Sequence, residues 1–164
     1  MRHHALNASG RGAGRGGAVQ TFQDTLRAPN DERLVEYYTT SQLAVVGVNG
    51  KVKEIGQPGI FTTAEPSPDG NFILTSRVKR PFSYLYPYFR FPADIEIMDK
   101  SGKSVKTLAN NTLQDNLPVQ GVPTEPRGFG WIPTEPATVV WAVALDGGNP
   151  ANKAEFRDKL MKSA

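Results

Sequence analysis

Hydrophobic and polar residues alternate in short runs along most of the chain, which is the pattern of β-strands. Clusters of Gly, Pro, Asn, Asp and Ser separate the runs, and these residues favour turns. The pattern predicts strands over 43–48, 51–55, 71–78, 95–98, 104–108, 129–131 and 138–143, with a further segment opening at Ile60-Phe61. The body of the chain is therefore predicted to be all-β.

Two hairpins are predicted from the turn chemistry. The pair Asn49-Gly50 lies between two apolar runs and favours a type I′ turn, which needs positive φ at both residues. The segment 99–103 contains Gly102 and predicts a second hairpin with a longer loop. Pro-containing turns are expected at 66–70 and 132–136.

Helical signals are few. A short helix is predicted over 33–38, capped by Asn30 or Asp31. The tyrosines at its end, Tyr37-Tyr38, are expected to be core residues. One or two helical turns are also expected within 153–161.

A weak internal repeat links two parts of the chain. In each part, a proline-containing turn (66–70 or 131–136) precedes a β-rich strand. The spacing is wider than the ~40–50 residues of a propeller blade, so a repeat would need an insertion at 79–93. A pair of unrelated sandwich hairpins explains the same pattern.

Composition separates a tail from the body. The chain has 164 residues, enough for one ordinary domain, and it has no Cys, which excludes disulfides and thiolate metal sites. Residues 1–20 are rich in Gly and Arg and predict a disordered tail, which leaves 21–164 as the folded domain. The net charge of +3 comes from three arginines in this tail, since the other 16 basic residues balance 16 acidic ones.

The charge and hydropathy patterns argue against two classes of partner. Three tail arginines without interleaved aromatic residues favour a spacer or a misplaced start over an RNA-binding arm, so no nucleic-acid partner is expected. No apolar run approaches the roughly 18 residues that cross a bilayer, and no membrane association or secretory signal is expected. The sequence leaves the localisation undecided.

The residue inventory argues against catalysis and cofactor binding by this chain. A hydrolase elbow needs Gly-x-Ser-x-Gly, and the nearest segment, 102–104, lacks that pattern. The only histidines, His3 and His4, lie in the tail, so neither a Ser-His-Asp triad nor a histidine metal site is expected in the body. No phosphate loop, metal or cofactor is predicted. Four carboxylates are expected to be solvated rather than catalytic: Glu54, Glu65, Asp94 and Glu96.

The combination of several motifs resembles a known family. They are Glu36-Tyr37-Tyr38-Thr39-Thr40-Ser41-Gln42-Leu43, Pro66-Ser67-Pro68-Asp69-Gly70, Arg80-Pro81-Phe82-Ser83-Tyr84, Arg90-Phe91-Pro92, and Trp131-Ile132-Pro133 through Trp141 to Asp146-Gly147-Gly148 and Arg157-Asp158-Lys159. Together, over about 21–161, they resemble the N-terminal β-propeller of prolyl oligopeptidase family serine peptidases, most closely the glutamyl endopeptidase branch.

The resemblance implies a partial β-propeller of one to two blades. In that family a propeller caps an α/β-hydrolase domain that carries Ser, Asp and His and cleaves peptides. The implied partners are therefore this hydrolase domain and a peptide substrate, and the implied role of the chain is substrate gating without catalysis. The alternative is a free-standing β-rich interaction module, which would bind a partner or self-associate through open strand edges.

Six of the fifteen aromatic residues lie within 81–91, flanked by two arginines. In an extended segment the alternate aromatic positions would share one face. This predicts a substrate-facing or domain-interface segment formed by Arg80, Phe82, Tyr84, Tyr86, Tyr88 and Arg90. An arginine here would suit the acidic side chain that the glutamyl endopeptidase branch prefers. The alternative is an aromatic plug that packs between blades or fills a domain interface.

Overall fold

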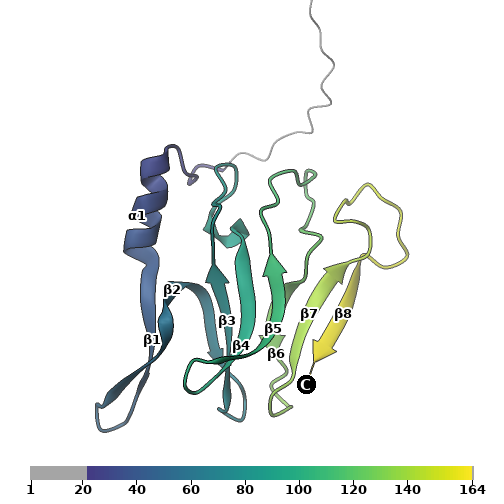
Figure 1. Ribbon diagram of the computed structural model, residues 1–164. Helices are drawn as coiled ribbons and strands as arrows, with labels where there is room; N and C mark the ends of the chain where they lie inside the picture. Colours follow the sequence, from purple (N-terminus) through teal and green to yellow (C-terminus); the bar gives the residue numbers. More distant parts are fainter. Residues whose placement is uncertain (1–21, 164) are drawn as a thin grey trace, which may run out of the picture.

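The computed structural model describes residues 22–163 (Figure 1). Strands are the main regular structure of this part of the chain, and they form two antiparallel sheets that do not close on each other. The elements in chain order are α1 (Pro29–Thr39), β1 (Thr40–Val46), β2 (Val52–Pro66), β3 (Phe72–Val78), the 3₁₀ helix η1 (Tyr88–Arg90), β4 (Ala93–Asp99), β5 (Ser104–Asn111), β6 (Arg127–Trp131), β7 (Val139–Ala144) and β8 (Asp158–Ser163). The predicted tail, residues 1–20, lies outside the described residues.

Both sheets are meanders, in which strands that follow one another in sequence are neighbours in space. The larger sheet has the order β1-β2-β3-β4-β5 and the smaller sheet has the order β6-β7-β8. Figure 1 shows the two sheets side by side, joined by the segment 112–126. Sequential pairing keeps the connections short, which is why local turn signals predicted most of the strands.

Alternation along β4 decides which face of the larger sheet is buried. Ala93, Ile95 and Ile97 are buried on one face. Asp94 and Glu96 point to the other face, where Asp94 pairs with a lysine and Glu96 accepts hydrogen bonds from Ser104 and Thr107. The strand therefore separates apolar and charged side chains with the expected period of two.

One apolar cluster holds the two sheets together. Leu74 on β3 and Val139 on β7 are its most buried aliphatic members, at 1% and 0% exposure. The indole Nε1 of Trp131 also donates a hydrogen bond to the backbone oxygen of Glu65, 3.0 Å away, which links the smaller sheet to β2. Partly buried residues pack around the cluster: Phe72, Leu108, Ala109, Phe129, Trp131 and Trp141.

The helix begins earlier than predicted, at Pro29 instead of Arg33. Proline is well suited to the first helical position because its missing N–H would have no partner there. The Asp31 carboxylate accepts hydrogen bonds from the backbone N–H groups of Arg27 and Ala28, at 2.8 and 3.0 Å. Asp31 therefore stabilises the N-terminus of the helix, although the residue at the N-cap position is Ala28.

The expectation that Tyr37-Tyr38 belong to the core is wrong. Their exposed fractions are 79% and 76%, and the two rings contact each other edge to face. The helix contributes Val35 instead, which packs with Leu26 against a second cluster formed by Val78, Phe82 and Phe91. Two consecutive residues of a helix cannot both point into the core when only a narrow stripe of the helix surface is buried.

Two further local expectations were wrong. The hairpin between β1 and β2 does not have the type I′ turn expected at Asn49-Gly50, since only Gly50 has positive φ there. Its loop has three residues: the Gly47 N–H donates to the Lys51 oxygen, and the Gly47 oxygen accepts from the Gly50 N–H. The helical turns expected within 153–161 are absent, since β8 covers part of this range and pairs with β7. The segment expected to open at Ile60-Phe61 is the second half of the long strand β2.

The β4–β5 loop packs closely on β2. Gly102 has φ +83, and the backbone N–H of Gly56 donates to the oxygen of Ser101 at 3.3 Å. A Cβ added to Gly102 would lie only 2.1 Å from the Gly56 nitrogen. Glycine is therefore required here for both its backbone conformation and its lack of a side chain.

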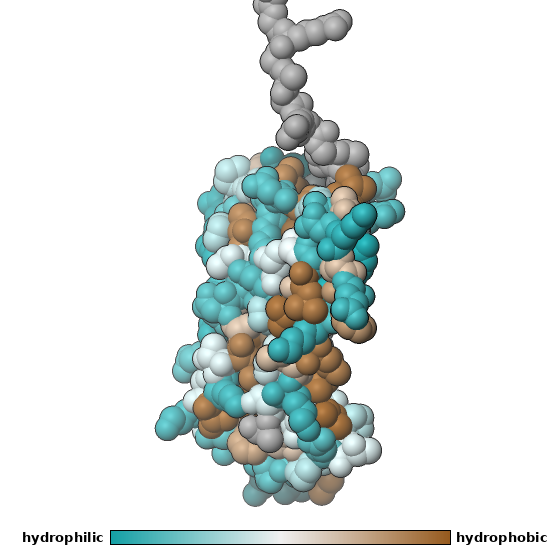
Figure 2. Space-filling view, turned by 90° about the vertical axis from the view of Figure 1, so that its right-hand side faces the viewer, coloured by the Kyte–Doolittle hydropathy of each residue, from teal (hydrophilic) through white to brown (hydrophobic). Residues whose placement is uncertain are grey.

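Hydrophobic side chains remain at the surface on the side of the molecule that carries β8 (Figure 2). Leu160 on β8 is 72% exposed, and Phe156 and Leu145 are also exposed. At the opposite edge, Val46 on β1 is exposed. Both outer edges of the described sheets are therefore uncovered and partly apolar. Within residues 22–163, no helix is long and apolar enough to cross a membrane.

Candidate functional site

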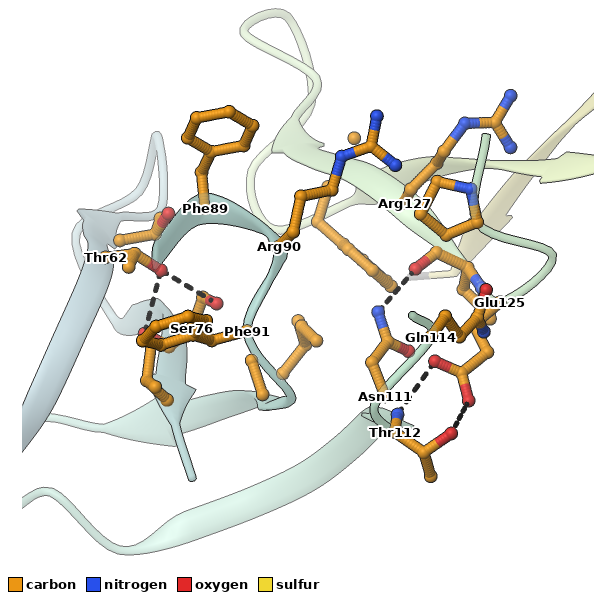
Figure 3. A pocket seen from close by; sticks show the side chains of 18 of the residues that line it. Thr62, Ser76, Phe89, Arg90, Phe91, Asn111, Thr112, Gln114, Glu125 and Arg127 are labelled. Carbon is orange, nitrogen blue, oxygen red and sulfur yellow. Dashed lines mark hydrogen bonds between the residues drawn. The ribbon is translucent and has the colours of Figure 1, made fainter. Parts of the chain in front are cut away.

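A pocket of about 310 Å³ lies where the two sheets meet. Its walls come from the larger sheet, from η1 and the residue after it, from the segment 112–126, and from the start of β6 (Figure 3). The volume is at the lower end of the range for small-ligand sites. The apolar wall includes Phe91 and Phe129, while threonine, asparagine, glutamine and arginine side chains supply polar groups.

The buried hydroxyl of Ser83 holds the segment before η1 in place. It accepts hydrogen bonds from the backbone N–H groups of Leu85 and Tyr86, at 3.0 and 2.9 Å. It also donates to the carboxylate of Asp115, 2.6 Å away. Asp115 belongs to 112–126, so this single side chain fixes the two segments that flank the pocket relative to each other.

The expectation that the aromatic residues of 81–91 share one face is wrong. The segment is not a strand, and it turns through η1. Phe82 and Tyr86 are buried, and Phe82 stacks on Phe91 with ring centroids 5.0 Å apart. Tyr84 and Tyr88 are exposed, and only Tyr88 of these four lines the pocket.

Arg80 lies away from the pocket and is fully engaged by helix α1. Its Nε and Nη2 donate to the two carboxylate oxygens of Glu36, at 2.7 and 2.9 Å, and its Nη1 contacts Glu32. The hydrogen bonds that Arg80 donates, first to Glu36 and then to Glu32, raise the pKa of Arg80, and the bond to Glu36 lowers the pKa of that carboxyl. The guanidinium also lies over the Phe82 ring. In the described structure Arg80 anchors the helix.

Arg90, the other predicted arginine, does line the pocket. Its guanidinium makes no hydrogen bond or ion pair with any residue in 22–163, and its Nη1 atom is buried without a partner. The Tyr86 ring lies 5.7 Å from the guanidinium carbon, a cation–π contact that fixes its direction. Arg90 therefore presents an unpaired positive charge at the pocket.

Two pocket residues that the sequence did not reveal also have a buried polar atom without a partner. The Nη1 atom of Arg127 and the Oδ1 atom of Asn111 are buried and have no partner among the described residues. Arg127 uses its Nη2 to pair with Asp158, and Asn111 uses its amide N–H to bond the Pro126 oxygen, 2.9 Å away. Figure 3 shows the Arg90 and Arg127 side chains at the same end of the pocket.

The one acidic residue that lines the pocket is already satisfied. Both carboxylate oxygens of Glu125 accept hydrogen bonds from Thr112, one from its backbone N–H at 2.8 Å and one from its hydroxyl at 2.7 Å. Glu125 therefore holds 112–126 against the end of β5, and neither pocket arginine is among its hydrogen-bond or ion-pair partners. Chemically, the pocket lining combines two guanidinium groups with amide and hydroxyl groups and this one carboxylate.

The described residues were also compared with the side-chain groups that bind metal ions. The chain's histidines lie outside them, and no group of three or more Asp or Glu side chains within 22–163 is placed to hold a metal ion. The four carboxylates that were expected to be solvated, Glu54, Glu65, Asp94 and Glu96, lie on strands β2 and β4.

Comparison with known proteins gives two significant relatives. The chain is 36% identical over 142 residues to a protein named "Probable glutamyl endopeptidase, chloroplastic" from Oryza sativa subsp. japonica, a match that covers 85% of this chain. It is 36% identical over 149 residues to the protein of the same name from Arabidopsis thaliana, covering 89% of this chain. No family model and no solved structure matches.

The similarity extends over most of this chain but over a small part of each relative. The chain spans 15% of the length of each of these relatives. The match extends over 85% to 89% of this chain. It places the chain beside proteins named as glutamyl endopeptidases.

Proposed function

We propose that this chain is a non-catalytic, partial β-propeller from a glutamyl endopeptidase-like serine peptidase of the prolyl oligopeptidase type. The observation that carries the proposal is the 36% identity over 85–89% of the chain to two proteins named as glutamyl endopeptidases, of which it spans 15%. A segment of that size is much smaller than a complete peptidase of this kind.

The arrangement of the sheets supports the propeller assignment. Blades are antiparallel meanders that pack against their neighbours around a channel, and both sheets here are meanders joined through one apolar cluster. The larger sheet has five strands and the smaller has three, against four in an ordinary blade. In this proposal the exposed apolar residues at the outer edges, such as Leu160 and Val46, are covered by further blades.

The proposed role is to position and gate a peptide over a hydrolase domain that supplies Ser, Asp and His. Residues 22–163 contain no histidine, so this part of the chain offers no imidazole to activate a serine by the usual base mechanism. The hydrolase domain and the peptide are the proposed partners.

A free-standing interaction module is the second candidate. The observation that favours it is the exposure of the outer strands β1 and β8, because open edges can pair with a strand of another chain. The coding sequence downstream separates the two proposals: continuation toward Gly-x-Ser-x-Gly favours the peptidase segment, and a stop followed by an unrelated gene favours the module.

The proposal is tested by incubating the purified chain with glutamyl and prolyl peptides and analysing the products by mass spectrometry. We expect the peptides to remain intact. Turnover that follows the chain through successive purification steps would refute the non-catalytic role.

A further inference from the structure

We infer that this chain forms a symmetric dimer in which the β1 strands of two copies pair antiparallel at the open edge of the larger sheet. The inference goes beyond the proposed function, which has further blades cover this edge in a longer protein, because here a second copy of the chain covers it. The starting observation is that β1 has a neighbouring strand on one side only, β2. An outer strand presents backbone N–H and C=O groups to its open side, where another strand can pair with them.

The sequence of β1 lacks the residues that usually protect an outer strand from pairing. Thr40–Val46 reads TSQLAVV and contains neither a charged residue nor a proline. An irregularity between Ser41 and Leu43 interrupts its pairing with β2, but the ladder is regular from Leu43 to Val46. Natural proteins guard open edges with charged side chains, proline or bulges. The last four residues of β1 carry none of these protections.

The outer strand of the smaller sheet is protected by comparison. Asp158–Ser163 reads DKLMKS and contains two lysines and one aspartate among six residues. Lysine side chains on an edge strand oppose pairing because their charges would have to lose water and would repel like charges on the partner. Of the outer strands β1 and β8, β1 is therefore the one that suits pairing with a second copy.

Exposed apolar side chains surround β1 and supply the area that a dimer needs. Tyr37 and Tyr38 are 79% and 76% exposed, so together they present about 300 Å² of surface. A standard protein interface buries about 800 Å² on each partner, which leaves the remainder to the aliphatic side chains and the backbone of the strand. Five exposed aliphatic residues lie in the same part of the chain: Leu34, Val45, Val46, Val48 and Val52.

The order of these residues along the edge favours an antiparallel second copy. Helix α1 lies at one end of β1 and the β1–β2 hairpin lies at the other (Figure 1). Antiparallel pairing therefore brings Tyr38 of each copy to the level of the hairpin loop that carries Val48 of the other. A two-fold axis at Ala44 sets Leu43 opposite Val45 of the second copy, and no charged residue of one β1 faces the other.

The test is sedimentation equilibrium of the whole chain over a range of concentrations, combined with hydrogen exchange followed by NMR. We expect a reversible dimer with twice the 17.9 kDa mass of the chain, which dissociates on dilution through the micromolar range. The β1 amides should gain protection from exchange as the dimer forms, whereas protection of the β8 amides should not change with concentration.

Matched variants assign the association to one edge. Val45→Lys places a charge in the β1 ladder and should weaken dimerisation roughly tenfold or more. Leu160→Lys introduces the same charge at an exposed position of β8 and should leave the dimer unchanged. Should Val45→Lys fail to give a dispersed spectrum, Val46→Lys makes the same test at a side chain that is 65% exposed.

Four results would overturn the inference. They are a chain that stays monomeric at all concentrations, whatever covers β1; a dimer that the folded lysine variants of β1 leave intact; an equal loss of dimer in Leu160→Lys; and concentration-dependent protection at β8 in place of β1. None of these bears on peptide turnover, which tests the proposed function separately, and the dimer would stand whether or not the chain cleaves peptides.

Discussion

Truncation of Leu74 to alanine tests whether one apolar cluster holds the two sheets together. Leu74 is 1% exposed and lies in the cluster that joins the larger sheet to Val139 of the smaller one. The change removes three carbons, worth about 2.4 kcal/mol of transfer free energy at ~0.8 kcal/mol per methylene group. The residual cavity adds to this, so we expect a loss of about 3 kcal/mol in the free energy of unfolding.

The assay is chemical denaturation followed by tryptophan fluorescence, because Trp131 and Trp141 pack against this cluster and report on it. Leu160→Ala is the matched control, since it removes the same atoms from a side chain that is 72% exposed. We expect the control to lose less than about 1 kcal/mol. A double-mutant cycle with Val139→Ala should show coupling of about 0.5 kcal/mol or more.

A loss of stability in Leu74→Ala no larger than that in Leu160→Ala would refute the packing described here. Additive effects of Leu74→Ala and Val139→Ala would refute the narrower claim that the two residues share one cluster across the sheets. If Leu74→Ala does not fold while Leu160→Ala does, the large cost is confirmed, because total stabilities of domains are only about 5–15 kcal/mol.

Three further predictions follow from other contacts. Gly50→Ala and Gly102→Ala both place a side chain at positive φ, but only the Cβ at position 102 would clash with the Gly56 backbone. Thermal unfolding should therefore show a severe loss of stability for Gly102→Ala and a smaller loss for Gly50→Ala. Equal losses of stability in the two variants would contradict this. Ser67→Ala should cost about 1–2 kcal/mol, since the buried hydroxyl bonds Asp69 and Phe72, and an unchanged melting curve would count against that role. The hydrogen bond from Arg80 lowers the pKa of Glu36 below its ordinary value of 4.5. The contribution of this bond to stability is therefore complete above pH 4.5 and is lost as the pH falls through the lower pKa of the folded state. NMR shifts of α1 amides should show the helix loosening in acid, and Glu36→Gln should remove the pH dependence of those shifts.

Local chemistry made most strands predictable from the sequence. The alternation of 95–98 and the turn residues of 99–103 specify β4 and its hairpin without distant information. The range 153–161 was misassigned because its strand is selected by pairing with β7, whose edge offers hydrogen bonds that no local pattern reveals. In such a segment, tertiary contacts outweigh the intrinsic secondary-structure propensity of the residues.

The candidate site was only partly predictable. Arg90 drew attention because it flanks an aromatic-rich segment, and the same reasoning selected Arg80, which the helix engages instead. Arg127 and Asn111 carried no motif, since they reach the pocket through packing between two sheets. The unpaired atoms that define the pocket are a property of the folded chain, and no spacing in the sequence encodes them.

A structure of the Oryza sativa relative would test the central proposal most directly. We predict that its segment matching 22–163 forms neighbouring blades of a closed β-propeller, with the pocket of Arg90 and Arg127 opening toward a hydrolase domain that holds Ser, Asp and His. A matching segment that folds as a separate module outside any propeller, with this pocket facing away from the hydrolase domain, would contradict the account.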